Sequence, residues 1–402
     1  MASPYQAIRV SDHVYWVGAI DWAVRDFHGY LTQRGTTYNA FLVMGDRIAL
    51  IDTVRSAFFD EMMARIASVV DPSRIDVIVS NHAELDHSGG LRQAIAALNP
   101  TDVHASDQGV KALIEHFGPI DNLTPVSEAQ PLDLGNMGLS FIETRMLHWP
   151  DSMFSYLAED QVLFCQDAFG MHLATSERFD DELPLDLLNY EAARYYANIL
   201  MPLSTMVTKL LERYGKLGLA VKYLATDHGP IWRSRLDHIM GLYGQWAAQA
   251  PSRKAVVAYE TMWGSTSRMA HAVAEGLIAQ GVSTKVMKLG ACHRSDIATE
   301  VLDAGALLLG TPTLNSTMLP QVADVLCYLR GLQPKNLVGA VFGSHGWNGK
   351  GVDHARESLA AMGVELVGDA VRSKYVPDAT TLDQCRALGE SVAHRLGQIC
   401  LA

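Results

Sequence analysis

The sequence predicts an α/β protein of two domains, an αββα sandwich over residues 1–250 and a doubly wound parallel sheet over residues 251–402. Its 402 residues exceed the length of a typical single domain. Before residue 250, predicted strands occur in mixed runs with helices between them, which favours two sheets with helices outside. After residue 250, strands and helices alternate regularly, which is typical of a parallel sheet.

Apolar alternation and helical periodicity define the elements of the first domain. The run Ile75–Ser80 is short, apolar and β-branched, so we expect a buried strand that leads directly into a polar loop. The predicted strands span residues 14–17, 39–43, 48–52, 75–80, 103–105 and 139–142, and the predicted helices span residues 58–70, 91–98 and 108–117.

A short linker at residues 244–253 leads into the second domain. Five strand–helix units follow, which indicates a doubly wound sheet of the flavodoxin type. The predicted strands span residues 254–259, 284–289, 306–310, 337–342 and 365–371, and the predicted helices span residues 267–280, 295–304, 319–332, 352–362 and 382–401.

Composition excludes several classes of partner. The formal net charge of −12 argues against nucleic-acid binding and against docking on anionic membranes. Residues 1–5 lack signal-peptide features, and no apolar run approaches the length of a membrane helix. Five scattered cysteines without a C-x-x-C pair suit a reducing cytoplasm, so we expect a cytoplasmic protein without an iron–sulfur or structural zinc site.

A dense group of potential metal ligands follows the predicted strand at 75–80. His82, Glu84, Asp86 and His87 lie within six residues, on a predicted loop. Imidazoles and carboxylates packed this closely are costly to bury unless a cation holds them. The sequence therefore predicts a metal site at the carboxyl end of this strand.

Three further potential ligands, His148, Asp167 and His228, each occur in a strand-end context near Gly or Pro. Any one of them alone could equally be a hydrogen-bonded histidine or a helix cap. Strand ends on one rim of a sandwich converge, so we expect these side chains to meet the 82–87 loop.

Loops of the second domain indicate a site for a ligand that carries a phosphate. The segment Glu260–Ser267 opens a helix with hydroxyls and backbone N–H groups, which favours a phosphate, although such a start is often only a cap. No P-loop motif is present, which argues against a nucleoside triphosphate, and no G-x-G-x-x-G fingerprint is present, which argues against a dinucleotide. A ligand with one phosphate that is bound without a lysine fits FMN. The loops at 311–315 and 344–349 follow strands near the topological switch point, where Trp347 can stack on a flavin. The candidate cofactor-binding residues are Thr261, Met262, Trp263, Ser265, Thr266, Ser267, Thr311, Pro312, Thr313, Asn315, Ser344, His345, Gly346, Trp347, Asn348 and Gly349.

The order of the seven candidate ligands resembles that of flavodiiron proteins, in which a metallo-β-lactamase-like domain is fused to a flavodoxin-like domain. The resemblance covers essentially all 402 residues and includes the segments 22–30, 36–40 and 143–152. Within the family, the chain is most similar to the rubredoxin:oxygen oxidoreductases of anaerobes. The resemblance implies two cofactors, FMN and a non-heme site with two Fe ions.

The resemblance also implies a ligand assignment. His82, Glu84 and His148 would hold one iron, Asp86, His87 and His228 the other, and Asp167 would bridge them. His87 could instead rotate away and leave a water ligand. Hydrolytic relatives carry H-x-H-x-D-H, so Glu84 replaces an imidazole with a carboxylate, which favours iron or manganese over zinc.

Residues beside the ligands are candidates for roles in catalysis. His172 is close to Asp167 in sequence, and Tyr195, or its neighbour Tyr196, could donate a phenol hydrogen bond to reduced oxygen. Trp149 and Phe27 are candidates for a wall that excludes water. Each of these side chains could equally be part of the core.

The expected function is reduction of O2 to water or of NO to N2O, with electrons passed from FMN. No rubredoxin module follows the second domain, so the expected donor is a separate rubredoxin or similar small carrier. The family resemblance implies a head-to-tail homodimer, with a tetramer as an alternative. Two other functions stay open: a dinuclear zinc hydrolase with an appended flavodoxin domain, and an electron-carrying flavoprotein whose first domain is only structural.

Overall fold

The structure, a computed structural model, describes residues 4–400. Residues 1–3 and 401–402 lie outside the described residues. The first three belong to the segment without signal-peptide features, and the last predicted helix ends at Leu401. The chain forms two compact units. One holds residues 4–28, 32–195 and 205–244, and the other holds residues 29–31, 196–204 and 245–400.

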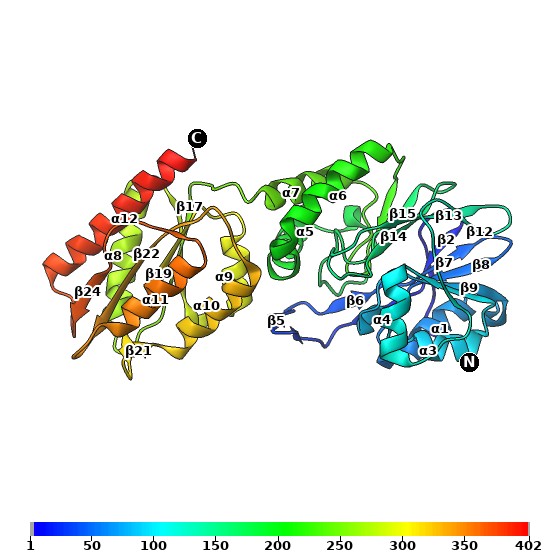
Figure 1. The fold of residues 1–402 in the computed structure, drawn as a ribbon, viewed down its shortest axis with the longest axis horizontal. Helices are drawn as coiled ribbons and strands as arrows, with labels where there is room; N and C mark the ends of the chain where they lie inside the picture. The colour runs from blue at the N-terminus through cyan, green and yellow to red at the C-terminus, as the bar shows by residue number, and fades with distance from the viewer. Residues whose placement is uncertain (1–3, 401–402) are drawn as a thin grey trace. The chain divides into compact units, whose positions relative to one another are not determined.

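Two sheets form the centre of the first unit (Figure 1). The seven-stranded sheet has the order β1-β2-β7-β8-β9-β10-β11, and the five-stranded sheet has the order β12-β13-β14-β15-β16. The strands of the first sheet are β1 Ile8–Arg9, β2 Val14–Trp16, β7 Phe41–Met44, β8 Ile48–Ile51, β9 Ile75–Ser80, β10 Asp102–Ala105 and β11 Leu123–Pro125. Those of the second are β12 Leu132–Asp133, β13 Gly138–Glu143, β14 Met153–Leu157, β15 Val162–Phe164 and β16 Tyr223–Ala225.

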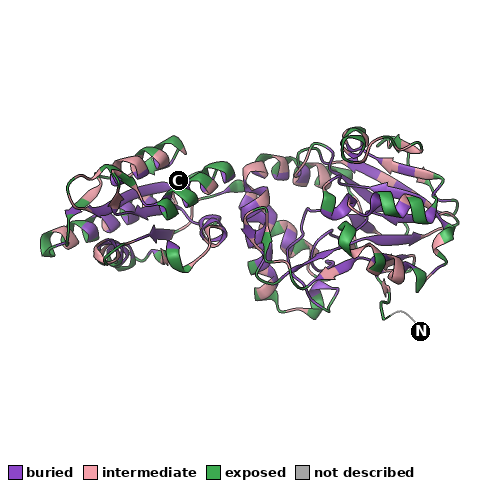
Figure 2. Ribbon diagram, turned by 90° about the horizontal axis from the view of Figure 1, so that it is seen from below, coloured by how far each residue is buried: buried purple, intermediate pink, exposed green. Residues whose placement is uncertain are grey.

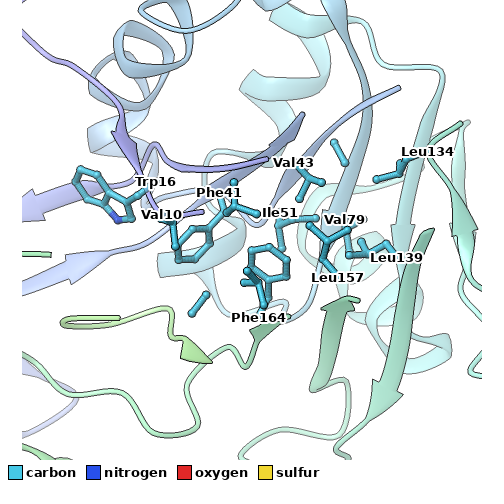
Figure 3. Packing of buried hydrophobic residues seen from close by; sticks show 14 of the residues in the cluster. Val10, Trp16, Phe41, Val43, Ile51, Val79, Leu134, Leu139, Leu157 and Phe164 are labelled. Atoms are coloured by element: carbon cyan, nitrogen blue, oxygen red, sulfur yellow. The ribbon is translucent and has the colours of Figure 1, made fainter. Parts of the chain in front are cut away.

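An apolar core fills the space between these two sheets (Figure 3). Phe41 and Ile51 of the first sheet pack with Leu157 and Phe164 of the second, and all four side chains are fully buried. The rings of Phe41 and Phe164 lie 5.3 Å apart. Because this core fixes the strands, it also fixes the polar residues that follow the strand ends.

Helices cover the outer faces of the sandwich. Helices α1 Phe59–Ala67, α3 Leu91–Leu98 and α4 Asp107–Phe117 share a second core with the first sheet. In α6 Ser204–Leu217, Arg213 donates a hydrogen bond of 2.8 Å to the carbonyl of Glu143 and so ties this helix to the end of β13. The remaining helices are α2 Leu85–Ser88, α5 Leu185–Tyr195 and α7 Leu236–Ala248. The predicted αββα sandwich is confirmed.

The second unit is a doubly wound sheet with the order β18-β17-β19-β22-β23. Its pairings are parallel, as predicted. The strands are β17 Lys254–Tyr259, β18 Ser283–Lys288, β19 Ala306–Gly310, β22 Val338–His345 and β23 Glu365–Leu366. The helices are α8 Ser265–Ala279, α9 Arg294–Val301, α10 Pro320–Leu332, α11 Lys350–Ala361 and α12 Ala379–Ile399. Figure 2 shows buried strands inside and exposed outer faces on the helices.

Two sequence predictions for this sheet are wrong. The predicted strand 365–371 is two short strands, β23 and β24 Val371–Lys374, because Gly368 between them takes a positive φ of 66°. The predicted end of β22 at residue 342 is too early, since β24 pairs with β22 as far as His345. Ser344 and His345 therefore lie in a strand and not in the loop that follows it.

Among residues 4–400, no helix has the length and apolarity that a membrane crossing requires.

Candidate functional site

Seven side chains from four strand ends meet at one rim of the first unit. His82 and Glu84 follow β9, Asp86 and His87 lie in α2, and the other three follow β13, β15 and β16. The predicted loop at 82–87 is therefore partly a helical turn, because α2 begins directly after Glu84. The seven side chains are those of His82, Glu84, Asp86, His87, His148, Asp167 and His228.

One group of four ligand atoms is formed by His82, Glu84, His148 and Asp167. The Nε2 atom of His148 lies 3.2 Å from Glu84 Oε2 and 3.0 Å from Asp167 Oδ2. The Nε2 atom of His82 lies 3.3 Å from Glu84 Oε2 and 3.4 Å from Asp167 Oδ2. Two imidazoles and two carboxylates thus point at one common position.

A second group is formed by Asp86, His87 and His228, and the other oxygen of Asp167 faces it. His87 Nε2 lies 3.4 Å from Asp86 Oδ2 and 3.3 Å from Asp167 Oδ1. His228 Nε2 lies 3.2 Å from Asp86 Oδ2 and 3.4 Å from Asp167 Oδ1. Asp167 therefore presents one oxygen to each group, as a bridging carboxylate does.

These separations fit a pair of metal ions. Metal–ligand bonds of about 2.1 Å place neighbouring ligand atoms about 3.0 Å apart in an octahedron and about 3.4 Å apart in a tetrahedron. Among the described residues, Asp86 Oδ1, His87 Nε2 and Asp167 Oδ1 are buried without a hydrogen-bond partner. Buried polar atoms left in this state are rare unless an ion or water completes them. The residues present fit a dinuclear metal site.

The electrostatics of this cluster point the same way. Burial lowers the pKa of His82, but hydrogen bonds with Asp151 and Glu84 outweigh burial and raise that pKa to about 10. Burial raises the pKa of Asp167, but the neighbouring charge of His87 and a hydrogen bond with His148 bring that pKa well below its ordinary value. Without metal, the cluster thus holds protons between imidazoles and carboxylates, at positions where cations would replace them.

Hydrogen-bond partners hold the outer nitrogens of two of the histidines. His82 Nδ1 lies 3.1 Å from Asp151 Oδ2, and His228 Nδ1 lies 2.6 Å from the carbonyl of Thr37. Such contacts fix the tautomer and orientation of metal-binding histidines. His87 Nδ1 lies 3.4 Å from Asp227 Oδ2 without a hydrogen bond between them. Sequence reasoning did not identify these partners, although two of them lie within three residues of a predicted ligand.

A cavity of about 600 Å³ opens beside the metal-binding residues. Glu84 and Asp86 line it, together with Phe27 and Trp149, the two predicted wall residues. The ring of Trp149 lies 5.1 Å from that of His82. The cavity also contains polar groups that the sequence did not indicate, namely Asp26, His28, Arg55, Ser56 and His116.

The structure brings His172 and Tyr195 next to this cluster. The ring of His172 lies 4.6 Å from that of His228 and 5.1 Å from that of Tyr195, and its Nδ1 lies 2.8 Å from Thr36 Oγ1. Burial, followed by the charge of Asp167, raises the pKa of Tyr195 well above its ordinary value. Tyr196 is not in the cluster, since its hydroxyl lies 3.1 Å from Ser204 Oγ.

A second cavity, of about 470 Å³, lies at the carboxyl end of the strands in the second unit. Trp263 and Trp347 line it and are 95% and 85% exposed, which is unusual for large aromatic side chains. The predicted residues that line it are Met262, Trp263, Ser265, Pro312, Thr313, Asn315, Ser344, His345, Gly346 and Trp347. Leu314, Tyr375 and Val376 also line it and were not identified from the sequence.

The other predicted cofactor residues are not among those that line this cavity. Thr266 Oγ1 lies 3.0 Å from Ser344 Oγ, and Ser267 Oγ lies 3.1 Å from the hydroxyl of Tyr259. Thr261 Oγ1 accepts a hydrogen bond from the N–H of Gly264. Gly264 is the residue before helix α8 and has a φ of +87°. The remaining three are Thr311, which bonds backbone groups, Asn348, which bonds Ser316, and Gly349, which precedes α11.

Two family matches cover both units. Residues 36–229 match the ODP family beta lactamase, and residues 257–389 match flavodoxin. The chain is 44% identical over 395 residues to the nitric oxide reductase of Moorella thermoacetica, an alignment that covers 97% of this chain and 99% of that one.

Solved structures give the same result along the whole chain. The rubredoxin oxygen:oxidoreductase from Desulfovibrio gigas has a TM-score of 0.97 and 40% identity, covering 99% of this chain and 100% of that one. The flavodiiron protein from Giardia intestinalis has a TM-score of 0.96 and 31% identity, covering 100% of this chain and 99% of that one. The fold class and the oxidoreductase class predicted from the sequence are confirmed. This chain belongs to the flavodiiron protein family, oxidoreductases that carry FMN and a non-heme diiron site.

Proposed function

We propose that this chain reduces O2 to water or NO to N2O at a diiron site in the first unit, with electrons delivered through FMN in the second. The observation that carries this proposal is the bridging position of Asp167, whose two oxygens face two separate groups of ligand atoms. Names of relatives support both gases, since one is a nitric oxide reductase and another a rubredoxin oxygen:oxidoreductase.

In this proposal His82, Glu84 and His148 hold one iron, and Asp86, His87 and His228 hold the other. Iron held by these residues would supply the redox chemistry that a diatomic gas requires. Two ferrous ions bring four positive charges, and Glu84, Asp86 and Asp167 offset three of them. The carboxylate at position 84 therefore favours redox-active iron, whereas an imidazole there would favour zinc.

Side chains around the ligands control protons and water in this proposal. Tyr195 carries its proton at neutral pH, and burial raises its pKa further, so its phenol can donate a hydrogen bond beside Asp167. His172 packs against His228 and holds that ring in place. Phe27 and Trp149 limit the access of water through the cavity.

FMN occupies the cavity of the second unit in this proposal. The start of helix α8 at Ser265 supplies backbone N–H groups for the phosphate. Trp263 and Trp347 offer aromatic faces for the isoalloxazine ring, which would account for the exposure of both side chains.

A rubredoxin or a similar small carrier supplies the electrons in this proposal, and two chains associate head to tail, so that FMN of one subunit serves the iron pair of the other. Light scattering measures the molar mass of the assembly and so distinguishes a dimer from a tetramer. The five cysteines are all free, which suits the cytoplasm.

Turnover of the anaerobically reduced protein with O2 and with NO, added separately, tests the proposal. Protein purified without added metal should contain iron and FMN, and with reduced rubredoxin it should consume O2 or NO. The Asp167→Ala variant should retain FMN and lose gas consumption. Two equivalents of zinc without iron, or unchanged consumption by this variant, would contradict the proposal and favour a hydrolase or a simple electron carrier.

A further inference from the structure

The carboxylate of Asp151 joins two of the segments that present metal ligands. Asp151 is buried, with only 2% of its surface exposed. Its Oδ2 atom accepts the N–H of Ala83 at 2.6 Å and lies 3.1 Å from Nδ1 of His82. Asp151 itself stands three residues after His148, so one side chain reaches from the turn that carries His148 to the segment that carries His82.

This contact selects one tautomer of His82. A carboxylate only accepts hydrogen bonds, so Nδ1 of His82 must carry the proton that is shared with Asp151. The lone pair of the neutral ring then lies on Nε2, which faces Glu84 Oε2 at 3.3 Å and Asp167 Oδ2 at 3.4 Å. The ring is thereby oriented to bind a cation on the side where the other ligand atoms gather.

The backbone of Asp151 is fixed as well. Its carbonyl accepts a hydrogen bond of 2.7 Å from the hydroxyl of Ser106. The same hydroxyl accepts the N–H of Gly109 and so caps helix α4. The hydroxyl of Ser106, which follows β10, thus holds the backbone of Asp151, while the carboxylate of Asp151 contacts His82.

We propose that Asp151 is a positioning residue for the first of the two metal positions: it sets the tautomer of His82 and fixes the turn of His148 relative to it. The inference rests on the proposed function, because it assumes that these histidines bind metal. It adds a residue that acts through His82 and does not touch the metal.

The pair of Asp160 and His13 offers a matched control. Asp160 Oδ1 lies 2.7 Å from His13 Nδ1, and Asp160 Oδ2 accepts the N–H of His13 at 2.7 Å. The groups in contact are the same as at Asp151, although the His13 side chain is 41% exposed and that of His82 is fully buried. His13 is not among the grouped ligand atoms. An effect that is specific to the metal site must appear in Asp151→Ala and be absent from Asp160→Ala.

The experiment measures the affinity of the metal-free full-length chain for Fe²⁺ under anaerobic conditions, by competition with a chelator. We expect Asp151→Ala to bind the first metal position about 10- to 100-fold more weakly, and Asp160→Ala to bind like wild type. Asp151→Asn keeps an acceptor oxygen for His82 but loses the charge, so its affinity should fall between those of Asp151→Ala and wild type.

Mössbauer spectra of the ⁵⁷Fe-loaded proteins supply a second readout. The Asp151 variants should change the signal of one iron and leave the other unchanged. Equal affinities of wild type and Asp151→Ala, equal losses in Asp160→Ala, or an Asp151→Asn variant no better than Asp151→Ala would overturn the inference. Should Asp151→Ala not fold, wild-type affinity in Asp151→Asn would overturn it. Wild type without iron binding would overturn the proposed function as well, so the two failures are distinguishable.

Discussion

Replacing Asp167 by Asn is the perturbation that most sharply separates two metal sites from one. Asp167 is 1% exposed, and each of its oxygens lies within 3.4 Å of two histidine nitrogens. An Asn side chain keeps one oxygen and places a nitrogen that cannot bind metal toward the other group. It also removes one of the three negative charges that offset the four positive charges of two ferrous ions.

The size of this effect follows from the burial of the charge. Removing one partner of a buried charge pair costs about 3–5 kcal/mol. At about 1.4 kcal/mol per tenfold, this is a loss of roughly 100- to 4,000-fold in affinity for one metal ion. We therefore expect Asp167→Asn purified from iron-rich medium to hold no more than about one iron per chain, measured by plasma mass spectrometry.

A buried acid outside the site controls for general damage to the fold. Asp180 is fully buried and accepts the N–H groups of Arg233 and Ser234. Asp180→Asn should therefore lower the thermal stability without lowering the iron content of the folded protein. Two irons bound with wild-type affinity in Asp167→Asn would refute the assignment of Asp167 as the bridge.

Three further predictions concern the flavin, the metal-free protein and the choice of metal. Trp347→Ala should weaken FMN binding by about 0.5–1.5 kcal/mol, roughly two- to twelvefold in Kd by flavin fluorescence, while Trp22→Ala on the first unit should not; equal Kd values would argue against stacking. Because the pKa of His82 is about 10 in the folded metal-free chain and about 6.5 when unfolded, its contribution to stability is complete below about pH 6.5 and is lost as pH rises through about 10. Denaturant unfolding of the metal-free chain at several pH values should record that loss, and a flat profile would contradict it. Glu84→His replaces an oxygen ligand with an imidazole, so the ratio of bound zinc to iron should rise in cells supplied with both metals; an unchanged ratio would count against the role given to Glu84.

The sequence was sufficient to bring the seven candidate ligands together, because each follows a strand and strands of one sandwich end at a common rim. It could not indicate Asp151 or Asp227 as partners of the histidines. Nothing in the spacing of 44 acidic residues tells which carboxylate faces a ring nitrogen, since that depends on how the turns fold back.

Two residues that line the cavity of the second unit, Tyr375 and Val376, were not predicted from the sequence for a different reason. Tyr375 and Val376 line the cavity of the second unit because they follow β24 at the carboxyl edge of the sheet. The prediction of one continuous strand over residues 365–371 concealed that edge. Gly368 is the signal in the sequence for this interruption, because glycine in a strand often marks a break or a bulge.

Anomalous diffraction from crystals of protein purified without added metal tests the central claim most directly. Data collected above and below the iron absorption edge should give two peaks, one on each side of the Asp167 carboxylate, with His82 and His148 at one and His87 and His228 at the other. Peaks that appear only at the zinc edge, or a single peak bound by one oxygen of Asp167, would contradict the account.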